Sequence, residues 1–332
     1  MTATFIRVVV RVLIACTVGA CGPTVAHAPT PSASNQSPAP SRVEVLASID
    51  LPAHDPRSHE LSGIAWDPLR RTALAISDEY PQIVELRPSQ DFKQWTLGDV
   101  TTVQAPAPWD GEGIALAAGR RFIANERPPR VMEIDAEGNV RGQLALPSYF
   151  EGCRRNRCIE SLTATPDGRH LFTANEATLT ADGPEANLEA GSSVHIVRFD
   201  LSGAATREWQ YVTDPVCAAG PAGEIGVSDL AALSASELLV LERSYVPEVK
   251  NRVRVYRATL GDEAVVRSKS LVFDVADLDR ARPFIPNYEG LALGPRLPDG
   301  RQLLLLVSDD NARASQRATL LVLAIPSLHT PP

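Results

Sequence analysis

The feature that most constrains the fold of this chain is a pattern that recurs five times along it. In each copy, a polar or acidic residue precedes a short run of small and aliphatic residues, a turn follows, and a second aliphatic run ends in Asp or Glu. The first runs begin at Ser62, Glu112, Glu160, Ser228 and Glu289. Self-similarity at this scale is typical of repeat architectures, in which each copy is one supersecondary unit. The sequence therefore predicts a repeat protein.

Each copy is expected to fold as a β-hairpin. The turns between the paired runs contain Pro-Asp-Gly, as at residues 166–168, or Pro-Leu-Arg-Arg, at residues 68–71. Pro supplies a fixed φ and Gly a positive φ, as tight turns require. Because the first strand of a hairpin starts beside the end of the second, both acidic positions of a copy are expected at the same end of the sheet.

Further strand-like runs complete the units. They are residues 82–87 and 95–103 in the first unit, 194–201 and 207–213 in the third, and 252–260 and 264–274 in the fourth. Four antiparallel strands per unit is the composition of a propeller blade. The fifth unit supplies only three, the last at 318–325, and a strand at 43–51 can complete its blade. We predict an all-β, five-bladed β-propeller whose N-terminal strand closes the ring. Six blades remain the alternative, because the third to fifth copies are spaced widely enough for extra strands.

The acidic positions are expected to meet around one mouth of the central channel, which the first strand of each blade lines. Carboxylates gathered in this way repel one another unless a cation or Arg neutralises them. Hard oxygen donors suit Ca²⁺ or Mg²⁺ better than zinc. The candidate ligands of a divalent cation, with Ca²⁺ preferred, are Asp78, Glu126, Glu176, Glu242, Asp309 and Asp310. The alternative interpretation is a rim of solvated charges.

Five further residues are candidates for catalysis. They are the acids Glu112, Glu160 and Glu289, as ligands or general bases, and Arg127 and Arg243, each directly after a repeated Glu, as phosphate clamps. Alternatively, each Arg pairs with a neighbouring acid and offsets the repulsion in the ring. A nucleophilic serine is not indicated, since the chain has no Gly-x-Ser-x-Gly motif and its six His do not follow the repeated register.

Three strings carry a resemblance to a known family. They are NRCIESL at 156–162, followed by PDG at 166–168; LVLER at 239–243; and NYEGLALGP at 287–295, followed by SDDN at 308–311. On these strings the chain resembles the phytase-like family, also described as esterase-like activity of phytase, over nearly all of residues 43–326. Two departures stand out: Cys158 where the family more often has Gly, and Asp310 where it more often has Asn.

The resemblance implies a secreted or envelope propeller whose acidic residues serve phosphoester chemistry. The leading expectation is metal-assisted hydrolysis of a small phosphorylated or esterified substrate, in which a divalent cation neutralises the phosphate and activates water. The rival expectation is a non-catalytic propeller that binds a ligand or a protein through its mouth, because a fold does not determine a function.

The N-terminus predicts export. Arg7 and Arg11 precede an apolar run at 12–20, and Cys21 follows Val-Gly-Ala, as in a lipoprotein signal peptide over residues 1–20 with Cys21 acylated; Cys16 is an alternative acylation site. The run is too short to span a bilayer. Residues 21–42, rich in Pro, Ala and Ser, are expected to be a disordered tether before a domain at 43–327. We therefore expect a monomeric protein of the cell envelope that touches the membrane only through its lipid.

Two other features bear on partners and redox state. Cys153 and Cys158 flank a loop with three Arg and are expected to form a disulfide in an oxidising envelope, with Cys217 as a competing partner. The three Arg either clamp a phosphate or form a solvated basic loop. A net charge of −8 without a basic stripe speaks against nucleic-acid binding.

Overall fold

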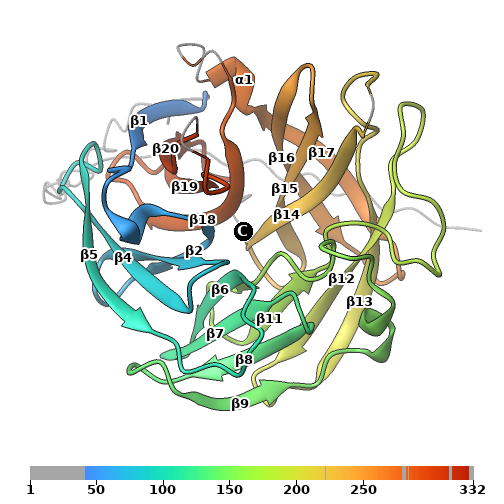
Figure 1. Ribbon diagram of the computed structural model, residues 1–332, viewed down its shortest axis with the longest axis horizontal. Helices are drawn as coiled ribbons and strands as arrows, with labels where there is room; N and C mark the ends of the chain where they lie inside the picture. The colour runs from blue at the N-terminus through green and yellow to red at the C-terminus, as the bar shows by residue number, and fades with distance from the viewer. Residues whose placement is uncertain (1–41, 221, 279–281, 283, 314–315, 329–332) are drawn as a thin grey trace, which may run out of the picture. The chain divides into compact units, whose positions relative to one another are not determined.

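A computed structural model of the chain describes residues 42–220, 222–278, 282, 284–313 and 316–328. Five four-stranded antiparallel sheets are arranged around a common centre as a five-bladed β-propeller (Figure 1). The predicted all-β propeller with five blades is therefore confirmed, and the six-bladed alternative is wrong. The predicted signal peptide, Cys21 and nearly all of the predicted tether lie outside the described residues.

The strands of each blade follow one another along the chain, except in the last blade. Blade 1 consists of β2 (Leu61–Asp67), β3 (Thr72–Ser77), β4 (Gln82–Pro88) and β5 (Trp95–Thr102). Blade 2 consists of β6 (Gly111–Ala117), β7 (Arg120–Asn125), β8 (Arg130–Ile134) and β9 (Val140–Leu144). Blade 3 consists of β10 (Thr163–Ala164), β11 (His170–Ala174), β12 (Ser193–Asp200) and β13 (Ala205–Val212). Blade 4 consists of β14 (Glu224–Ala232), β15 (Glu237–Val246), β16 (Lys250–Leu260) and β17 (Val266–Asp274).

Blade 5 closes the ring. It consists of β18 (Asn287–Arg296), β19 (Gln302–Asp309), β20 (Thr319–Ile325) and the N-terminal strand β1 (Glu44–Asp50). Strand β1 pairs antiparallel with β20, in a register that runs from Glu44 opposite Ala324 to Asp50 opposite Thr319. The predicted pairing of the strands at 43–51 and 318–325 is thus confirmed, and hydrogen bonds between the two ends of the domain join them.

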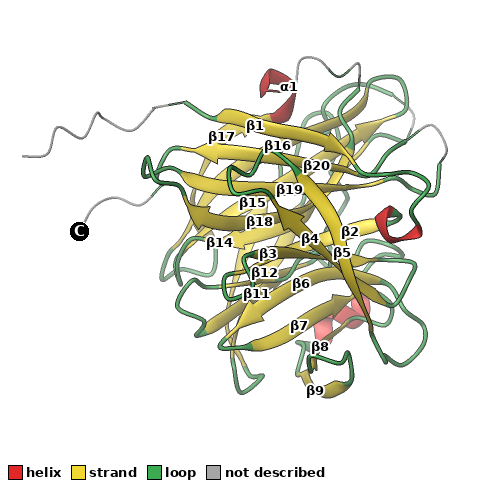
Figure 2. Cartoon of the chain, turned by 90° about the vertical axis from the view of Figure 1, so that its left-hand side faces the viewer, coloured by secondary structure: helices red, strands yellow, loops and turns green. Residues whose placement is uncertain are grey.

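In the part of the chain that the structure describes, helical structure is confined to three short segments (Figure 2). Two are 3₁₀ turns, η1 (Pro56–Ser58) and η2 (Ser148–Gly152), and the third is α1 (Val275–Leu278). Among the described residues, no helix has the length and hydropathy needed to cross a membrane.

The core lies between neighbouring blades, so that inner strands are buried on both faces. In β19, Leu303 and Leu305 pack toward blade 1, whereas Leu304 and Leu306 pack toward blade 4. The sequence of a strand that is buried on both faces is a continuous apolar run rather than an alternation of apolar and polar residues. Each fully buried Leu contributes about 1.5–3 kcal/mol to stability through the hydrophobic effect.

The first strands of the blades contact one another in succession around the centre. They approach so closely that Gly directly follows the polar residue in three of the five copies, at Gly63, Gly113 and Gly290. A Cβ at Gly63 would lie 2.4 Å from the backbone oxygen of Glu112, and one at Gly290 would lie 2.4 Å from that of Ser62. In these three copies the Gly therefore has a packing cause, and the close approach of the first strands holds the polar side chains around one mouth.

Candidate active site

A cavity of about 410 Å³ opens at the acidic mouth of the channel. Its lining combines carboxylates with guanidinium groups. The acidic residues are Asp78, Glu112, Glu160, Glu176, Glu224, Glu289 and Asp309, and the basic residues are Arg155, Arg157, Arg243 and Arg313. A larger cavity of about 810 Å³ lies at the turn end of the hairpins, and none of the residues predicted for the site lines it.

Hairpin geometry brings the acidic side chains together. Asn287, at the start of β18, pairs with Asp309 at the end of β19, and Leu61 of β2 pairs with Ser77 of β3 in the same way. Seven residues predicted from the repeat therefore line this one cavity. They are Asp78, Glu112, Glu160, Glu176, Arg243, Glu289 and Asp309.

Burial dominates the electrostatics of the acids at the first strands. It raises the pKa of Glu112, Glu160 and Glu289 well above the ordinary value of a glutamate. Repulsion between neighbouring carboxylates acts in the same direction, as between Glu160 and Glu112 or between Glu289 and Asp309. The site therefore favours protons, cations or basic side chains that offset this charge.

Arg243 provides part of this compensation. Its Nη2 lies 3.3 Å from Oε1 of Glu176 and 3.4 Å from Oε1 of Glu289, and its Nη1 lies 3.9 Å from Oε1 of Glu224. Only 13% of the Arg243 side chain is exposed. Burial alone would lower the pKa of Arg243, but the surrounding carboxylates outweigh it and raise the pKa above its ordinary value. This Arg thus pairs with acids of its own and of neighbouring blades rather than with the adjacent Glu242.

The other arginines of the cavity come from two loops. Arg157 forms ion pairs with Glu176, at 3.5 Å, and with Glu224. Arg155 and Arg313 are exposed at the cavity, and neither forms an ion pair with any residue in the described part of the chain. These two guanidinium groups are available to an anionic ligand.

A disulfide between Cys153 and Cys158 holds the first of these loops. It presents Arg155 and Arg157 to the cavity. Arg154 instead donates hydrogen bonds to the backbone oxygens of Thr178 and Gly183. Only two of the three Arg of this loop therefore face the acidic mouth.

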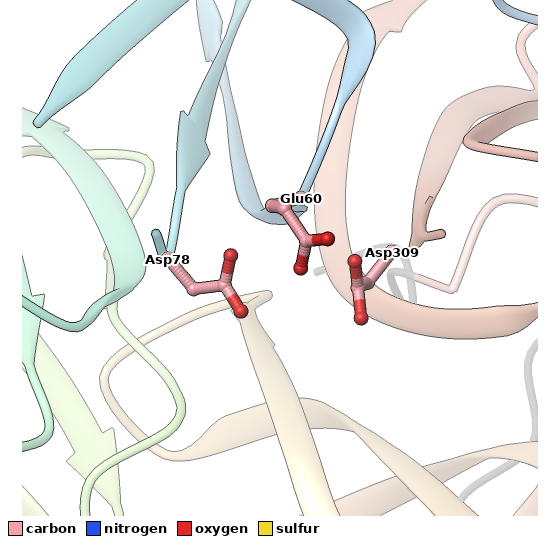
Figure 3. Close-up of side chains that lie close together, drawn as sticks. All are labelled: Glu60, Asp78 and Asp309. Carbon is pink, nitrogen blue, oxygen red and sulfur yellow. The ribbon is translucent and has the colours of Figure 1, made fainter. Parts of the chain in front are cut away.

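Three carboxylates at the seam between blades 1 and 5 form a compact group: Glu60, Asp78 and Asp309. One oxygen of each lies within 4.8 Å of the others, and Figure 3 shows the three carboxyl groups turned toward a common space. Burial raises the pKa of Glu60 to about 7 and that of Asp78 to about 8, and it also raises the pKa of Asp309. The set contains only hard oxygen donors, as Ca²⁺ and Mg²⁺ prefer.

A second compact group consists of Asp110, Glu112 and Glu126. Its members already have partners in the protein. Nε of Arg127 lies 2.5 Å from Oδ2 of Asp110 and 3.4 Å from Oε2 of Glu126. The backbone N–H of Cys158 donates to Oε1 of Glu126 at 2.6 Å, and burial raises the pKa of Glu126 to about 7. Glu126 and Arg127 therefore lie beside the cavity of the mouth rather than on its lining.

Glu242 lies elsewhere, although it was predicted to be a metal ligand. Successive side chains of a strand point to opposite faces, so Glu242 faces away from the cavity that Arg243 lines. Its Oε1 lies 2.5 Å from Nζ of Lys269, and its Oε2 accepts a hydrogen bond from the backbone N–H of Asp214 at 2.9 Å. The hydroxyl of Tyr211 donates to Oε1 as well, at 2.5 Å, so a salt bridge and two hydrogen bonds occupy this carboxylate.

Asp310 also lies outside the cavity lining. Its Oδ2 is 2.7 Å from Nδ1 of His59, and its Oδ1 accepts a hydrogen bond from the backbone N–H of Glu60 at 3.1 Å. Both oxygens therefore hold the segment that carries Glu60, and Asp310 positions a carboxylate of the site instead of joining it.

Sequence reasoning missed Glu60 and Asp110, and a third repeated position explains why. Both stand two residues before the polar residue that starts a copy. Their backbone carbonyls accept a hydrogen bond from the acid at the end of the same hairpin. The N–H of Asp78 donates to the carbonyl of Glu60 at 3.0 Å, and the N–H of Glu126 donates to that of Asp110 at 2.8 Å. Cys158 occupies the same position in blade 3, where Glu176 is its partner. The residue type at this position varies between copies. Only its fixed place in the repeat, two residues before the polar residue, could have identified Glu60 and Asp110 from the sequence.

All of these site residues except Arg313 fall within residues 56–312, which match the family described as "Phytase-like: Esterase-like activity of phytase". This match covers more than half of the chain. The chain belongs to the phytase-like family. The predicted resemblance is confirmed, and the acidic mouth lies within the part of this phytase-like protein that defines the family.

Solved structures similar to this phytase-like protein come from several kinds of protein. Glutaminyl cyclase from Myxococcus xanthus is 10% identical, with a TM-score of 0.47 over 85% of this chain and 95% of that chain. A gluconolactonase from Xanthomonas campestris is 16% identical, with a TM-score of 0.40 over 87% and 80% of the two chains. A periplasmic gluconolactonase from Pseudomonas aeruginosa is 15% identical, with a TM-score of 0.36 over 80% and 86%. No curated protein matches the sequence.

Proposed function

We propose that this phytase-like protein hydrolyses a phosphate ester at the acidic mouth with the help of a divalent cation. One observation carries the proposal: the same cavity contains carboxylates without a basic partner and arginines without an acidic partner, among the residues described. A ligand that satisfies both must present anionic oxygens together with a cation. A phosphate ester with Ca²⁺ has this chemistry.

The arginines supply the phosphate contacts. Arg155 and Arg313, exposed on the rim, bind phosphate oxygens through their planar forks of N–H donors. Arg243 lies deeper and is fixed by Glu176 and Glu289, so it is suited to stabilising charge that develops on the phosphate oxygens during the reaction.

The carboxylates supply the cation site. Asp78 and Asp309 line the cavity, offer hard oxygen ligands, and form no ion pair with a basic side chain of the described residues. When bound there, a divalent cation neutralises the substrate phosphate and lowers the pKa of water. Ca²⁺ is the preferred ion because a purely carboxylate set of variable geometry suits it.

Glu160 is the proposed general base. Its carboxyl lines the cavity, makes no hydrogen bond or ion pair with another described residue, and has a pKa that burial raises well above its ordinary value. When deprotonated, such a group is a stronger base than an ordinary carboxylate. The proton of the attacking water passes to Glu160 as the water oxygen bonds to phosphorus. The bond between phosphorus and the ester oxygen breaks, and the leaving oxygen takes up a proton from solvent.

A substrate screen tests this proposal. The purified protein is assayed on a phosphomonoester, a phosphodiester and a carboxyl ester, with Ca²⁺ and with EDTA. We expect Ca²⁺-dependent turnover of a phosphate ester that falls by about 10²-fold or more in Glu160→Gln, as is typical for loss of a general base. The matched control is Glu133→Gln, which changes a Glu of β8 that pairs with Arg120 away from the cavity. Turnover of the carboxyl ester alone contradicts the substrate class, and no turnover at all leaves the non-catalytic propeller as the correct interpretation.

The residues before the propeller support a proposal about location. We infer that the protein is exported, acylated at Cys21 and monomeric, and that its lipid is its only contact with the membrane. Labelled fatty acid should be incorporated into the wild-type protein and not into Cys21→Ser. Equal labelling of both proteins contradicts the inference.

A further inference from the structure

We propose that Glu60, Asp78 and Asp309 form a Ca²⁺ site that ties blade 1 to blade 5 at the seam where the ring closes. Glu60 directly precedes β2, Asp78 directly follows β3, and Asp309 ends β19. A cation shared by these residues links the first blade to the blade that contains both ends of the domain. This site extends the cation site of the proposed function by Glu60, and its Ca²⁺ binding and effect on stability can be measured whether or not the mouth is catalytic.

The spacing of the carboxylates suits the ion. Ca²⁺ lies about 2.3–2.6 Å from its oxygen ligands, so two ligands on opposite sides of it are up to about 5.2 Å apart. One oxygen from each of the three residues lies within 4.8 Å of the other two. In Figure 3 the three side chains extend from different segments toward the same space, as ligands of one ion must. The remaining ligand positions are left to water or to the second oxygens of the carboxylates.

An unsatisfied atom points to the missing partner. Glu60 is only 5% exposed, and its Oε1 has no hydrogen-bond partner among the described residues. A buried carboxylate oxygen without a partner costs free energy, since water has been removed and nothing replaces it. No Lys or Arg in the described part of the chain forms an ion pair with Glu60, Asp78 or Asp309. A cation between the three carboxylates would satisfy this oxygen and cancel their repulsion.

The backbone holds Glu60 in place for this role. Glu60 has a φ of 53°, in the left-handed region that residues other than Gly avoid. Asp310 fixes the segment from blade 5 through the backbone N–H of Glu60 and the ring of His59. The cost of the unusual φ is consistent with a side chain that must reach one particular point, as residues at ligand sites often do.

The second carboxylate group is a poorer candidate. Asp110, Glu112 and Glu126 already have the guanidinium of Arg127, the hydroxyl of Ser62 and a backbone N–H as partners. A cation there would have to displace Arg127 or share its ligands. The charge balance therefore favours the group at the seam.

Calorimetric titration of the EDTA-treated protein with CaCl₂ tests the site, together with thermal unfolding at each Ca²⁺ concentration. We expect measurable binding and an unfolding temperature that rises with Ca²⁺ by mass action. Glu60→Gln, Asp78→Asn and Asp309→Asn should each weaken Ca²⁺ binding by about tenfold or more, because affinity depends on the number of charged ligands. The matched control is Glu126→Gln, a buried Glu of the second group, which should bind Ca²⁺ as the wild type does.

Three results would overturn the proposal. The first is no heat and no thermal shift at about 10 mM Ca²⁺, well above the weakest dissociation constants of extracellular modules. The second is wild-type affinity in Glu60→Gln, and the third is a loss of binding in Glu126→Gln. Near-UV circular dichroism identifies any variant that does not fold. If one ligand variant does not fold, the Ca²⁺ affinities of the other two ligand variants test the site. Turnover without Ca²⁺ binding would remove this site and leave a hydrolase, whereas binding without turnover would leave the site alone.

Discussion

The guanidinium of Arg243 lies 3.4 Å from the carboxylate of Glu289, across the boundary between the fourth and fifth blades. It also lies 3.3 Å from Glu176 of the third blade, so one buried cation joins three blades at the mouth of the channel. From the sequence, Arg243 was either a phosphate clamp or a partner of neighbouring acids. The structure shows that it pairs with acids, and any contact with phosphate would be additional.

This arrangement predicts that Arg243→Ala destabilises the fold. Removing the guanidinium leaves buried carboxylates without their partner, which typically costs about 3–5 kcal/mol in the free energy of unfolding. Urea unfolding at pH 8 measures the loss. The control is Arg169→Ala, whose side chain is 80% exposed and should change stability by less than about 0.5 kcal/mol. A loss in Arg243→Ala no larger than in this control would contradict the structural role.

The raised pKa values predict a pH dependence of stability in the metal-free protein. In the folded state burial raises the pKa of Glu60 to about 7 and that of Asp78 to about 8, from ordinary values of 4.5 and 3.8. Between these limits the folded state holds more protons than the unfolded state, so the free energy of unfolding decreases as pH rises from about 4.5 to about 8. Ca²⁺ should reduce the decrease. Urea unfolding in EDTA across this range checks the sign, and a free energy that rises with pH would refute it.

The two arginines on the rim predict a change in anion affinity without a change in stability. Arg155 and Arg313 are exposed and have no acidic partner among the described residues, so Arg155→Ala and Arg313→Ala should unfold at the wild-type temperature. Each should weaken inhibition by inorganic phosphate by about tenfold, the effect of losing roughly 1.4 kcal/mol of charge-assisted hydrogen bonding. Arg154→Ala is the matched contrast, because Arg154 bonds to backbone oxygens and should affect stability rather than phosphate inhibition. Unchanged inhibition in both rim variants would exclude them as anion contacts.

Ring closure by β1 predicts that the domain depends on its first strand. Leu46 and Ile49 of β1 pack on the core between blades 5 and 1, and the strand pairs with β20 from Glu44 to Asp50, with one irregularity between Val45 and Ala47. Deleting residues 43–51 should lower the unfolding temperature by at least about 10 °C or abolish cooperative unfolding. A synthetic peptide of residues 43–51, added in excess, should restore much of the loss. An unchanged unfolding temperature after the deletion would mean that β1 does not contribute to closure.

Much of this fold could be predicted from the sequence because the repeat reflects two features of the structure: the close approach of neighbouring first strands and the shared end of the two strands of each hairpin. Gly63 and Gly290 are small because neighbouring strands approach their backbones, and Glu112 and Glu289 mark the same end of each hairpin. The closing strand followed from counting strands in the fifth unit.

The candidate site was less predictable, because strand parity and loop conformation decide where a side chain points. Glu242 and Arg243 are adjacent in the sequence, yet Glu242 forms a salt bridge with Lys269 on the opposite face of the strand, whereas Arg243 lines the cavity. Glu60 reaches the seam through a left-handed backbone conformation, which cannot be predicted from the sequence because a Glu rarely adopts it. In blade 3 the first strand is regular only over Thr163–Ala164, so the predicted strand at Glu160 is an irregular segment.

Phosphate ester turnover, measured as a function of Ca²⁺ concentration in the wild type and in Asp309→Asn, shows whether the mouth is a Ca²⁺-dependent hydrolase. Asp309 lies where the cation site meets the cavity with the arginines, so its carboxylate should serve both binding and catalysis. We expect Ca²⁺-dependent turnover in the wild type and a decrease of about 10²-fold or more in Asp309→Asn at saturating substrate, as is typical for loss of a preorganised electrostatic contact. Turnover that is independent of Ca²⁺, or equal in the two proteins, would contradict it.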